Sequence, residues 1–160
     1  MVSPDIALWR IAKHTLQFRV DDLSGGGAKI TGGRWNSKGQ AVLYASTSIA
    51  LATLETLAHL GDNIAIRNAF LVRLDIPPSL WKQRQIISPD DLDPTWSAEP
   101  PGSTSVAWGD AWLRASNSAL LLVPSVIVPE ECNVLINPAH PDCKRINASV
   151  VRQFVYDPRL

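Results

Sequence analysis

Apolar residues recur along this chain in short segments, most of them with the two-residue period that is typical of β-strands. In the first segment, 7–11, Trp9 and Ile11 flank Arg10, and residues 41–45 form a short apolar run that predicts a buried strand. Further strands are predicted at 70–76, 119–128, 134–136 and 150–156.

A helical period replaces the strand pattern between residues 46 and 60. The sequence Ser-Thr-Ser at 46–48 offers N-cap residues, and Gly61 predicts the end of the helix. Apolar residues cover a broad arc of this helix at 100° per residue. Glu55 lies just beyond the edge of that arc, where a carboxylate is neither deep in the core nor on the open solvent face.

The remaining segments predict two loops and a second helix. Glycine density over 24–36 predicts a loop, because glycine permits positive φ and close backbone approach. The segment 89–105 is rich in Pro, Ser, Asp and Thr, which predicts a mobile surface segment. A short helix is expected over 106–117, with Trp108 and Trp112 on one face.

The order of these elements favours a single mixed domain. Strands outnumber helices and cluster toward the C-terminus, which indicates an α+β domain with a largely antiparallel sheet. No repeat or linker divides the chain, so we expect one domain over 1–160. Residues 1–15 lack the pattern of a secretory signal, and the longest apolar stretch is too short to span a bilayer. We therefore expect the cytoplasm as its compartment.

Charge and cysteine content exclude several classes of function. Fifteen basic and fifteen acidic residues cancel, so we expect no direct nucleic-acid binding and no membrane binding. Cys132 and Cys143 are expected to be free thiols. Together with His140 and Asp142 they match no common zinc spacing, so no metal site is predicted.

Four side chains are candidates for chemistry, each with a structural alternative. Arg34 lies in a glycine-flanked loop, where it either binds a diphosphate with its guanidinium or is a surface residue of a turn. Tyr44 is a core residue or a flat platform for a nicotinamide ring. Glu55 would be costly to bury among apolar residues without a role or an ion-pair partner. Ser125 is either functional or a satisfied hydroxyl.

Seven short motifs follow one another in an order that is specific as a set, although each is weak alone. They are WRI at 9–11, GGRWN at 32–36, LYAS at 43–46, LE at 54–55, VPS at 123–125, ECN at 131–133 and NPAHP at 137–141. This set resembles the RES domain of bacterial toxin–antitoxin systems, from about residue 7 to residue 154. The arginine, glutamate and serine that name the family fall on Arg34, Glu55 and Ser125, with Tyr44 as the accompanying aromatic.

The resemblance implies a fold, a reaction and a partner. RES domains are similar to ADP-ribosyltransferases, with a split antiparallel β-core and flanking short helices around an NAD cleft. They are toxins that deplete NAD by hydrolysis or phosphorolysis, so NAD is a substrate and no separate cofactor is implied. The implied partner is an Xre-type antitoxin with a helix-turn-helix, which blocks the cleft. Whether the protein forms a homodimer is not decided by the sequence, because Trp81 and Trp96 fit either an interface or the core.

The same resemblance assigns catalytic roles to three residues. Glu55 would hold the ribose hydroxyls and stabilise the positive charge that builds on the ribose as nicotinamide leaves. Arg34 would anchor the diphosphate and Tyr44 would orient the nicotinamide, which are both contributions of positioning.

Three further residues are expected at the substrate, and the acceptor stays open. Arg10 is expected as a second anion contact or a structural partner of Glu55, Ser46 as a contact and helix cap, and Ser125 as a lining residue. Many protein-modifying ADP-ribosyltransferases have Glu or Gln two residues before the catalytic glutamate. Thr53 stands there, which favours water or phosphate as acceptor. A protein-directed transferase stays as an alternative, as does a non-enzymatic module whose Arg34 and Glu55 form an internal salt bridge.

Overall fold

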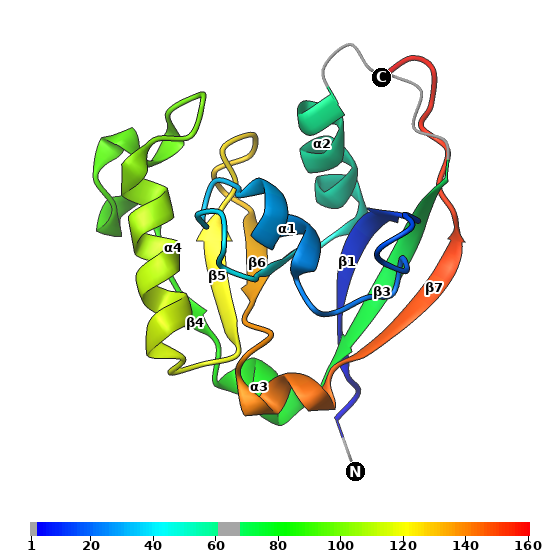
Figure 1. Ribbon diagram of the computed structural model, residues 1–160, viewed down its shortest axis with the longest axis horizontal. Coiled ribbons are helices and arrows are strands. Elements are labelled where there is room, and N and C mark those ends of the chain that lie inside the picture. Colours follow the sequence, from blue (N-terminus) through cyan, green and yellow to red (C-terminus); the bar gives the residue numbers. More distant parts are fainter. Residues whose placement is uncertain (1–2, 61–67) are drawn as a thin grey trace.

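The computed structural model describes residues 3–60 and 68–160 (Figure 1). Within them, the strands form one seven-stranded sheet in the order β4-β5-β6-β2-β1-β3-β7. The strands are β1 Ile6–Lys13, β2 Leu43–Ser46, β3 Ala69–Ile76, β4 Gln85–Ile86, β5 Leu120–Pro124, β6 Cys132–Ile136 and β7 Asn147–Gln153. The α-helices are α1 Gly26–Thr31, α2 Ile49–Leu60, α3 Pro78–Lys82 and α4 Ser103–Ala115. The predicted α+β class is confirmed.

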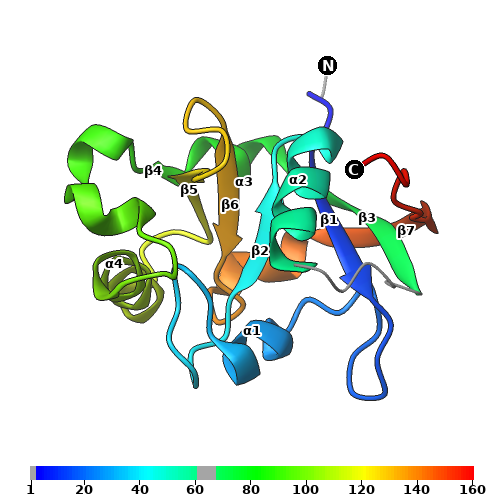
Figure 2. The same cartoon turned by 90° about the horizontal axis from the view of Figure 1, so that it is seen from above.

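The sheet consists of two halves that meet at one residue pair. β1 is antiparallel to β3 from Ile6 to Lys13, and β2 is antiparallel to β6 along its whole length. Between β1 and β2, only Trp9 and Ser46 pair. The sheet is therefore split at its centre, as predicted, and only β4 and β5 run parallel. Figure 2 shows α2 above this junction, in agreement with its contacts to β1 and β2.

Apolar side chains fill the space on both faces of β5. Leu120 and Leu122 belong to a core cluster with residues of β1, β2, β3 and β6. Leu121 and Val123 point to the opposite face, because successive strand residues alternate, and they pack in a second cluster with Trp112 of α4. Burial on both faces explains why β5 has no polar position.

The helix predicted over 46–60 is confirmed as α2. The Ser48 hydroxyl accepts a hydrogen bond from the Leu51 backbone N–H at 3.1 Å, which satisfies one of the free donors at the helix start. The predicted stop, Gly61, lies outside the described residues. The second predicted helix is α4; within it Trp112 is buried, whereas Trp108 is 37% exposed.

Two predicted loops are wrong in part. The glycine-rich stretch contains a short helix, α1, which begins after Gly25 and ends before Gly32, both with φ of 70°. The segment 89–105 lies mostly on the surface, as predicted, but it is not a featureless loop, since it forms two 3₁₀ turns, Pro89–Asp91 and Pro94–Ser97, before α4 begins. Its mobility stays a prediction. Pro89 and Pro94 begin these turns and Asp93 caps the second, which composition alone does not distinguish from a loop.

The burial of Trp96 decides between the interface and the core positions that the sequence left open for it. Trp96 is 6% exposed and lies 6.3 Å from Trp35 between ring centroids. It therefore belongs to the core and is not available to an interface, while Trp81 is half-buried beside the Arg84 guanidinium. No helix among the described residues is long and apolar enough to cross a bilayer.

Candidate active site

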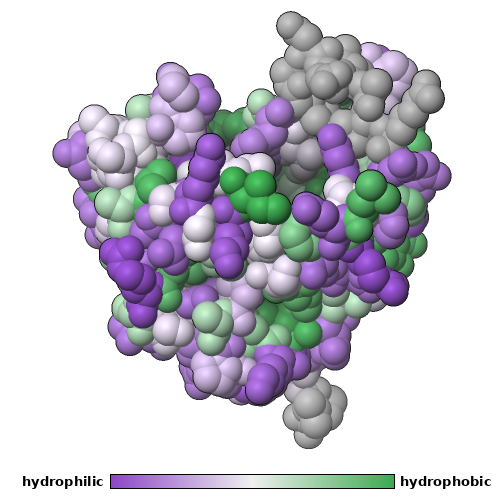
Figure 3. Space-filling view, in the orientation of Figure 1, coloured by the Kyte–Doolittle hydropathy of each residue, from purple (hydrophilic) through white to green (hydrophobic). Residues whose placement is uncertain are grey.

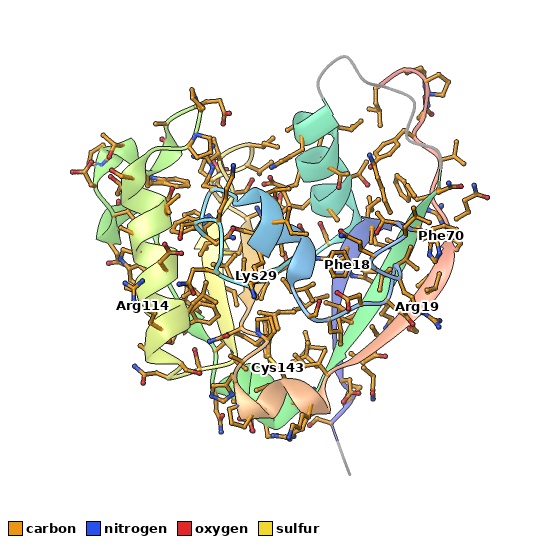
Figure 4. All side chains as sticks on the ribbon, in the orientation of Figure 1. Phe18, Arg19, Lys29, Phe70, Arg114 and Cys143 are labelled. Atoms are coloured by element: carbon orange, nitrogen blue, oxygen red, sulfur yellow. The ribbon has the colours of Figure 1, made fainter. Side chains whose placement is uncertain are left out.

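A cleft of about 1000 Å³ lies at the junction of the two sheet halves. Its walls come from β1, the loop 14–25, α1, the loop 32–35, β2, α2, the segment that contains Glu99 and Pro101, the turn after β5 and Asn133 of β6. The predicted site residues on these walls are Arg10, Arg34, Tyr44, Ser46 and Glu55. Phe18, labelled in Figure 4, also lines the cleft and packs against Gly26 of α1, where a Cβ would lie 2.5 Å from the ring. Figure 3 shows a mostly hydrophilic face with small, separate hydrophobic patches.

Two side-chain donors hold Glu55 at one end of the cleft. The Ser125 hydroxyl donates to Glu55 Oε1 at 2.6 Å, and Asn133 Nδ2 donates to the same oxygen at 2.6 Å. Ser46 in turn donates to Asn133 Oδ1 at 2.7 Å. Residues from α2, β2, β6 and the end of β5 thus form one network that fixes the carboxylate.

Ser125 is fully buried, and its hydrogen bonds determine which way its hydroxyl points. Its Oγ accepts from the backbone N–H groups of Ile127 and Val128, both at 3.1 Å. With both lone pairs engaged, the hydroxyl proton is directed to Glu55. Ser125 therefore lies behind Glu55, as its partner, and not in the cleft wall with Pro124 and Val126.

The second carboxylate oxygen of Glu55 is available to a ligand. Both donors bind Oε1, and Oε2 has no hydrogen-bond partner among the residues that the structure describes. An ionised carboxylate accepts up to about four hydrogen bonds. The arrangement leaves one oxygen of a fixed carboxylate for a hydroxyl in the cleft.

Arg34 lies at the other end of the cleft and binds a neighbouring segment of the chain. Its Nη1 donates to the carbonyl oxygens of Trp96 at 3.1 Å and Ala98 at 2.8 Å. Its Nη2 forms an ion pair of 2.6 Å with Glu99 Oε2. The Arg34 side chain is 16% exposed and that of Glu99 is 75% exposed, so a surface carboxylate occupies one side of a half-buried guanidinium.

Helix α4 holds the loop that carries Arg34. The Asp110 carboxylate accepts from the Ser37 backbone N–H at 3.0 Å and from the Ser37 hydroxyl at 2.6 Å. One residue earlier, a Cβ on Gly109 would lie 1.7 Å from the Trp35 carbonyl oxygen, so only glycine permits this approach of loop and helix.

The Tyr44 hydroxyl is used within the protein. It donates to Asn36 Oδ1 at 2.7 Å and accepts from the Trp35 backbone N–H at 3.1 Å. Burial raises the pKa of Tyr44, so its hydroxyl stays protonated. Because Tyr44 also lines the cleft, its ring is the part that a ligand can contact.

Arg10 contributes a buried positive charge beside Tyr44. Its Nη1 donates to the Tyr44 carbonyl oxygen at 2.8 Å, and its buried Nε has no partner in the described chain. Burial lowers the pKa of Arg10 to about 10, opposed by the nearby Asp22, so the guanidinium is charged at neutral pH. Arg10 is therefore held by a backbone carbonyl, and the alternative of a structural pair with Glu55 is not what the structure shows.

Thr53 lies on a different side of α2 from Glu55. Glu55 lies within α2, where residues two apart point about 160° away from each other. The Thr53 hydroxyl donates to the Ile49 carbonyl oxygen at 2.8 Å, within its own helix. Thr53 is therefore not placed beside the Glu55 carboxylate, and the acceptor stays a prediction.

Three site residues were missed by the sequence predictions: Asn133, Glu99 and Asp110. Asn133 could have been identified, because it belongs to the ECN motif and pairs with Ser46 across β2 and β6. The other two act on residues 65 and 73 positions away, which no local pattern reveals. Both cysteines are free thiols, and no group of three potential ligands among residues 3–60 and 68–160 is placed to hold a metal.

Comparison with known proteins places this geometry in a family. The RES domain model matches residues 7–157. The chain is 50% identical over 154 residues to the Prs ADP-ribosylating toxin of Sphingobium sp. (strain YBL2), which covers 96% of each chain. It is 38% identical over 154 residues to Toxin Res of Yersinia enterocolitica serotype O:8 / biotype 1B (96% and 98% covered) and 41% identical over 138 residues to Toxin Res of Photorhabdus laumondii subsp. laumondii (86% of each). The chain belongs to the RES domain family.

Proposed function

We propose that this protein is a cytoplasmic toxin that depletes NAD by breaking its nicotinamide–ribose bond, through hydrolysis or phosphorolysis. The observation that carries the proposal is the Glu55 carboxylate, held by Ser125 and Asn133 with one oxygen left toward a cleft that also contains two arginines. A fixed negative charge and separate positive charges in one cleft suit a substrate that has a ribose and a diphosphate.

Glu55 acts on the charge that develops during bond breaking. As the bond lengthens, its electron pair leaves with nicotinamide, which becomes neutral, and positive charge builds on the ribose. Glu55 Oε2 accepts a hydrogen bond from a ribose hydroxyl and stabilises that charge. Because the carboxylate is already held in place before the reaction, little reorganisation is needed. Water or phosphate then bonds to the ribose carbon, and one proton is released when water is the acceptor.

The two arginines and Tyr44 position the substrate. Arg34 binds the diphosphate, which takes the place of the Glu99 carboxylate on the guanidinium, and Arg10 adds a second positive charge. The Tyr44 ring orients the nicotinamide, since its hydroxyl is bound to Asn36. Ser46 acts through Asn133.

A second candidate is transfer of ADP-ribose to a protein. The observation that favours it is the relative from Sphingobium sp., which is named for ADP-ribosylating Prs and is 50% identical to this chain. The bond that breaks is the same, and only the acceptor differs. A non-enzymatic module is disfavoured, because the internal pair that it requires is absent from the described residues: Arg34 pairs with Glu99 and not with Glu55. For either reaction we propose an Xre-type antitoxin as the partner, in keeping with two relatives named Toxin Res.

The test is NAD turnover by the purified protein. Nicotinamide release is measured with and without phosphate, and ³²P-labelled NAD is supplied with and without purified Prs. We expect Glu55→Gln to lower the rate by about a hundredfold to a thousandfold, as for other preorganised electrostatic groups. Glu130→Gln, at an exposed position, is the matched control and keeps the wild-type rate.

The products distinguish the candidates. ADP-ribose or its phosphate ester as the sole labelled product supports NAD depletion, and label on Prs supports the transferase. Folded wild-type protein that releases no nicotinamide with any of the three acceptors would refute both.

A further inference from the structure

We propose that Asn133 is a positioning residue that sets the orientation of the Glu55 carboxylate for bond breaking. The inference rests on the proposed function, because it assigns Asn133 a role in that reaction. Asn133 lies on β6 directly opposite Ser46 of β2, and its amide reaches from there to Glu55 on α2. One side chain thus connects two strands to the helix that carries the carboxylate.

The chemistry of the three groups determines which end of the Asn133 amide faces Glu55. A carboxylate only accepts hydrogen bonds, so at 2.6 Å from Glu55 Oε1 the amide must present its Nδ2 donor. The opposite orientation would place two acceptor oxygens at that distance. Ser46 can donate or accept, and it completes the observed orientation by donating to Asn133 Oδ1 at 2.7 Å.

An amide holds the carboxylate without neutralising it. A lysine or arginine at this position would form an ion pair with Glu55 and cancel the negative charge that the proposed reaction uses. Asn133 and Ser125 are both uncharged donors, and both bind Oε1. The site therefore fixes the direction of the carboxylate and leaves its charge to act on the ribose.

Loss of Asn133 removes one of the two donors and leaves Ser125 as the other. The carboxylate is then free to rotate about its last bond, so fewer molecules have Oε2 in the productive position. Such a change lowers kcat, while the arginines and Tyr44 that bind the substrate stay in place.

The test compares Asn133→Ala, Asn133→Asp and wild-type protein, with Asn147→Ala on exposed β7 as the matched control. We expect Asn133→Ala to lower kcat by about ten- to thirtyfold with KM changed by less than about threefold, the size expected for loss of a charge-assisted hydrogen bond. Asn133→Asp keeps the shape and the acceptor for Ser46 but places a carboxylate against Glu55, so it should lower kcat further. A residue that only links β2 to β6 would tolerate this change.

A second readout needs no activity and separates this inference from the proposed function. The side-chain amide signals of Asn133 are identified in ¹⁵N NMR spectra by their absence in Asn133→Ala. If Asn133 donates to the carboxylate, Glu55→Ala shifts these signals strongly, whereas Glu130→Ala leaves them unchanged.

The outcomes are distinct. Wild-type protein that releases no nicotinamide refutes the proposed function and with it the role of Asn133 in that reaction, even when the NMR contact is present. Active wild-type protein with an unchanged kcat in Asn133→Ala, or with wild-type activity in Asn133→Asp, overturns the inference about Asn133 alone. Amide signals that do not respond to Glu55→Ala overturn it as well.

Discussion

The two ends of the cleft are built in opposite ways. At the Glu55 end, the contacts come from Asn133 on β6 and from the fully buried Ser125, and they leave the other carboxylate oxygen without a partner among the described residues. At the Arg34 end, the contacts come from the segment 96–99, and the last of them is the exposed carboxylate of Glu99. One end is complete before a ligand arrives, whereas the other already carries a substitute for the ligand's anion.

This difference indicates how the work of binding and reaction is divided. A buried group that loses its partner costs about 1–3 kcal/mol, so the Glu55 network resists distortion. An exposed ion pair contributes only about 0–1 kcal/mol, so Glu99 can be displaced by a diphosphate at little cost. If the proposed function holds, the reacting end is therefore fixed and the binding end is exchangeable.

Apart from the loss of Glu55 itself, the largest effect is expected from breaking the Arg34 end. Arg34→Ala should raise KM for NAD about thirtyfold with a smaller change in kcat, because it removes charge-assisted contacts to the diphosphate. Steady-state kinetics measure the two constants. The control is Arg114→Ala, since Arg114 is exposed on the outer side of α4 (Figure 4). A fall in kcat alone would contradict the assignment of Arg34 to binding.

The next effect is expected at the other end. Ser125→Ala should lower kcat about tenfold with KM nearly unchanged, since Glu55 loses a donor. It also leaves the Ile127 and Val128 N–H groups without their acceptor, so the free energy of unfolding should fall by about 1–3 kcal/mol. Urea unfolding checks the second expectation, with the exposed Ser149→Ala for comparison. If KM alone changed, Ser125 would be a ligand contact after all.

The smallest effect is expected from Glu99, and it is the one change that should increase the affinity for NAD. Glu99→Gln removes the charge that competes for Arg34, so KM for NAD should fall about threefold at low salt. The gain should shrink at high ionic strength, where exposed charges are screened. Titration of NAD into the Glu55→Gln background measures the affinity without turnover. Weaker binding in Glu99→Gln would mean that Glu99 supports the site.

Local features of the sequence predicted the local features of the structure. The helix that carries Glu55 and its Ser48 cap were predictable, because caps and periodicity act over a few residues. The split of the sheet was expected only from the resemblance to RES domains. The partners of the site residues were not predictable, since Asn133 and Glu55 are 78 positions apart and meet only through the strand register. Composition did not reveal the short 3₁₀ turns within 89–105, nor that Trp96 between them is buried.

The single pair of Trp9 and Ser46 has a consequence for how the fold is held together. Each half of the sheet has its own backbone ladder, and almost nothing of that ladder crosses between β1 and β2. A molecule in the cleft that contacts Arg10 on one side and Glu55 on the other makes the cross-links that the backbone omits there. The substrate is then a structural component of the protein for as long as it is bound, and ligand concentration becomes a determinant of its melting temperature.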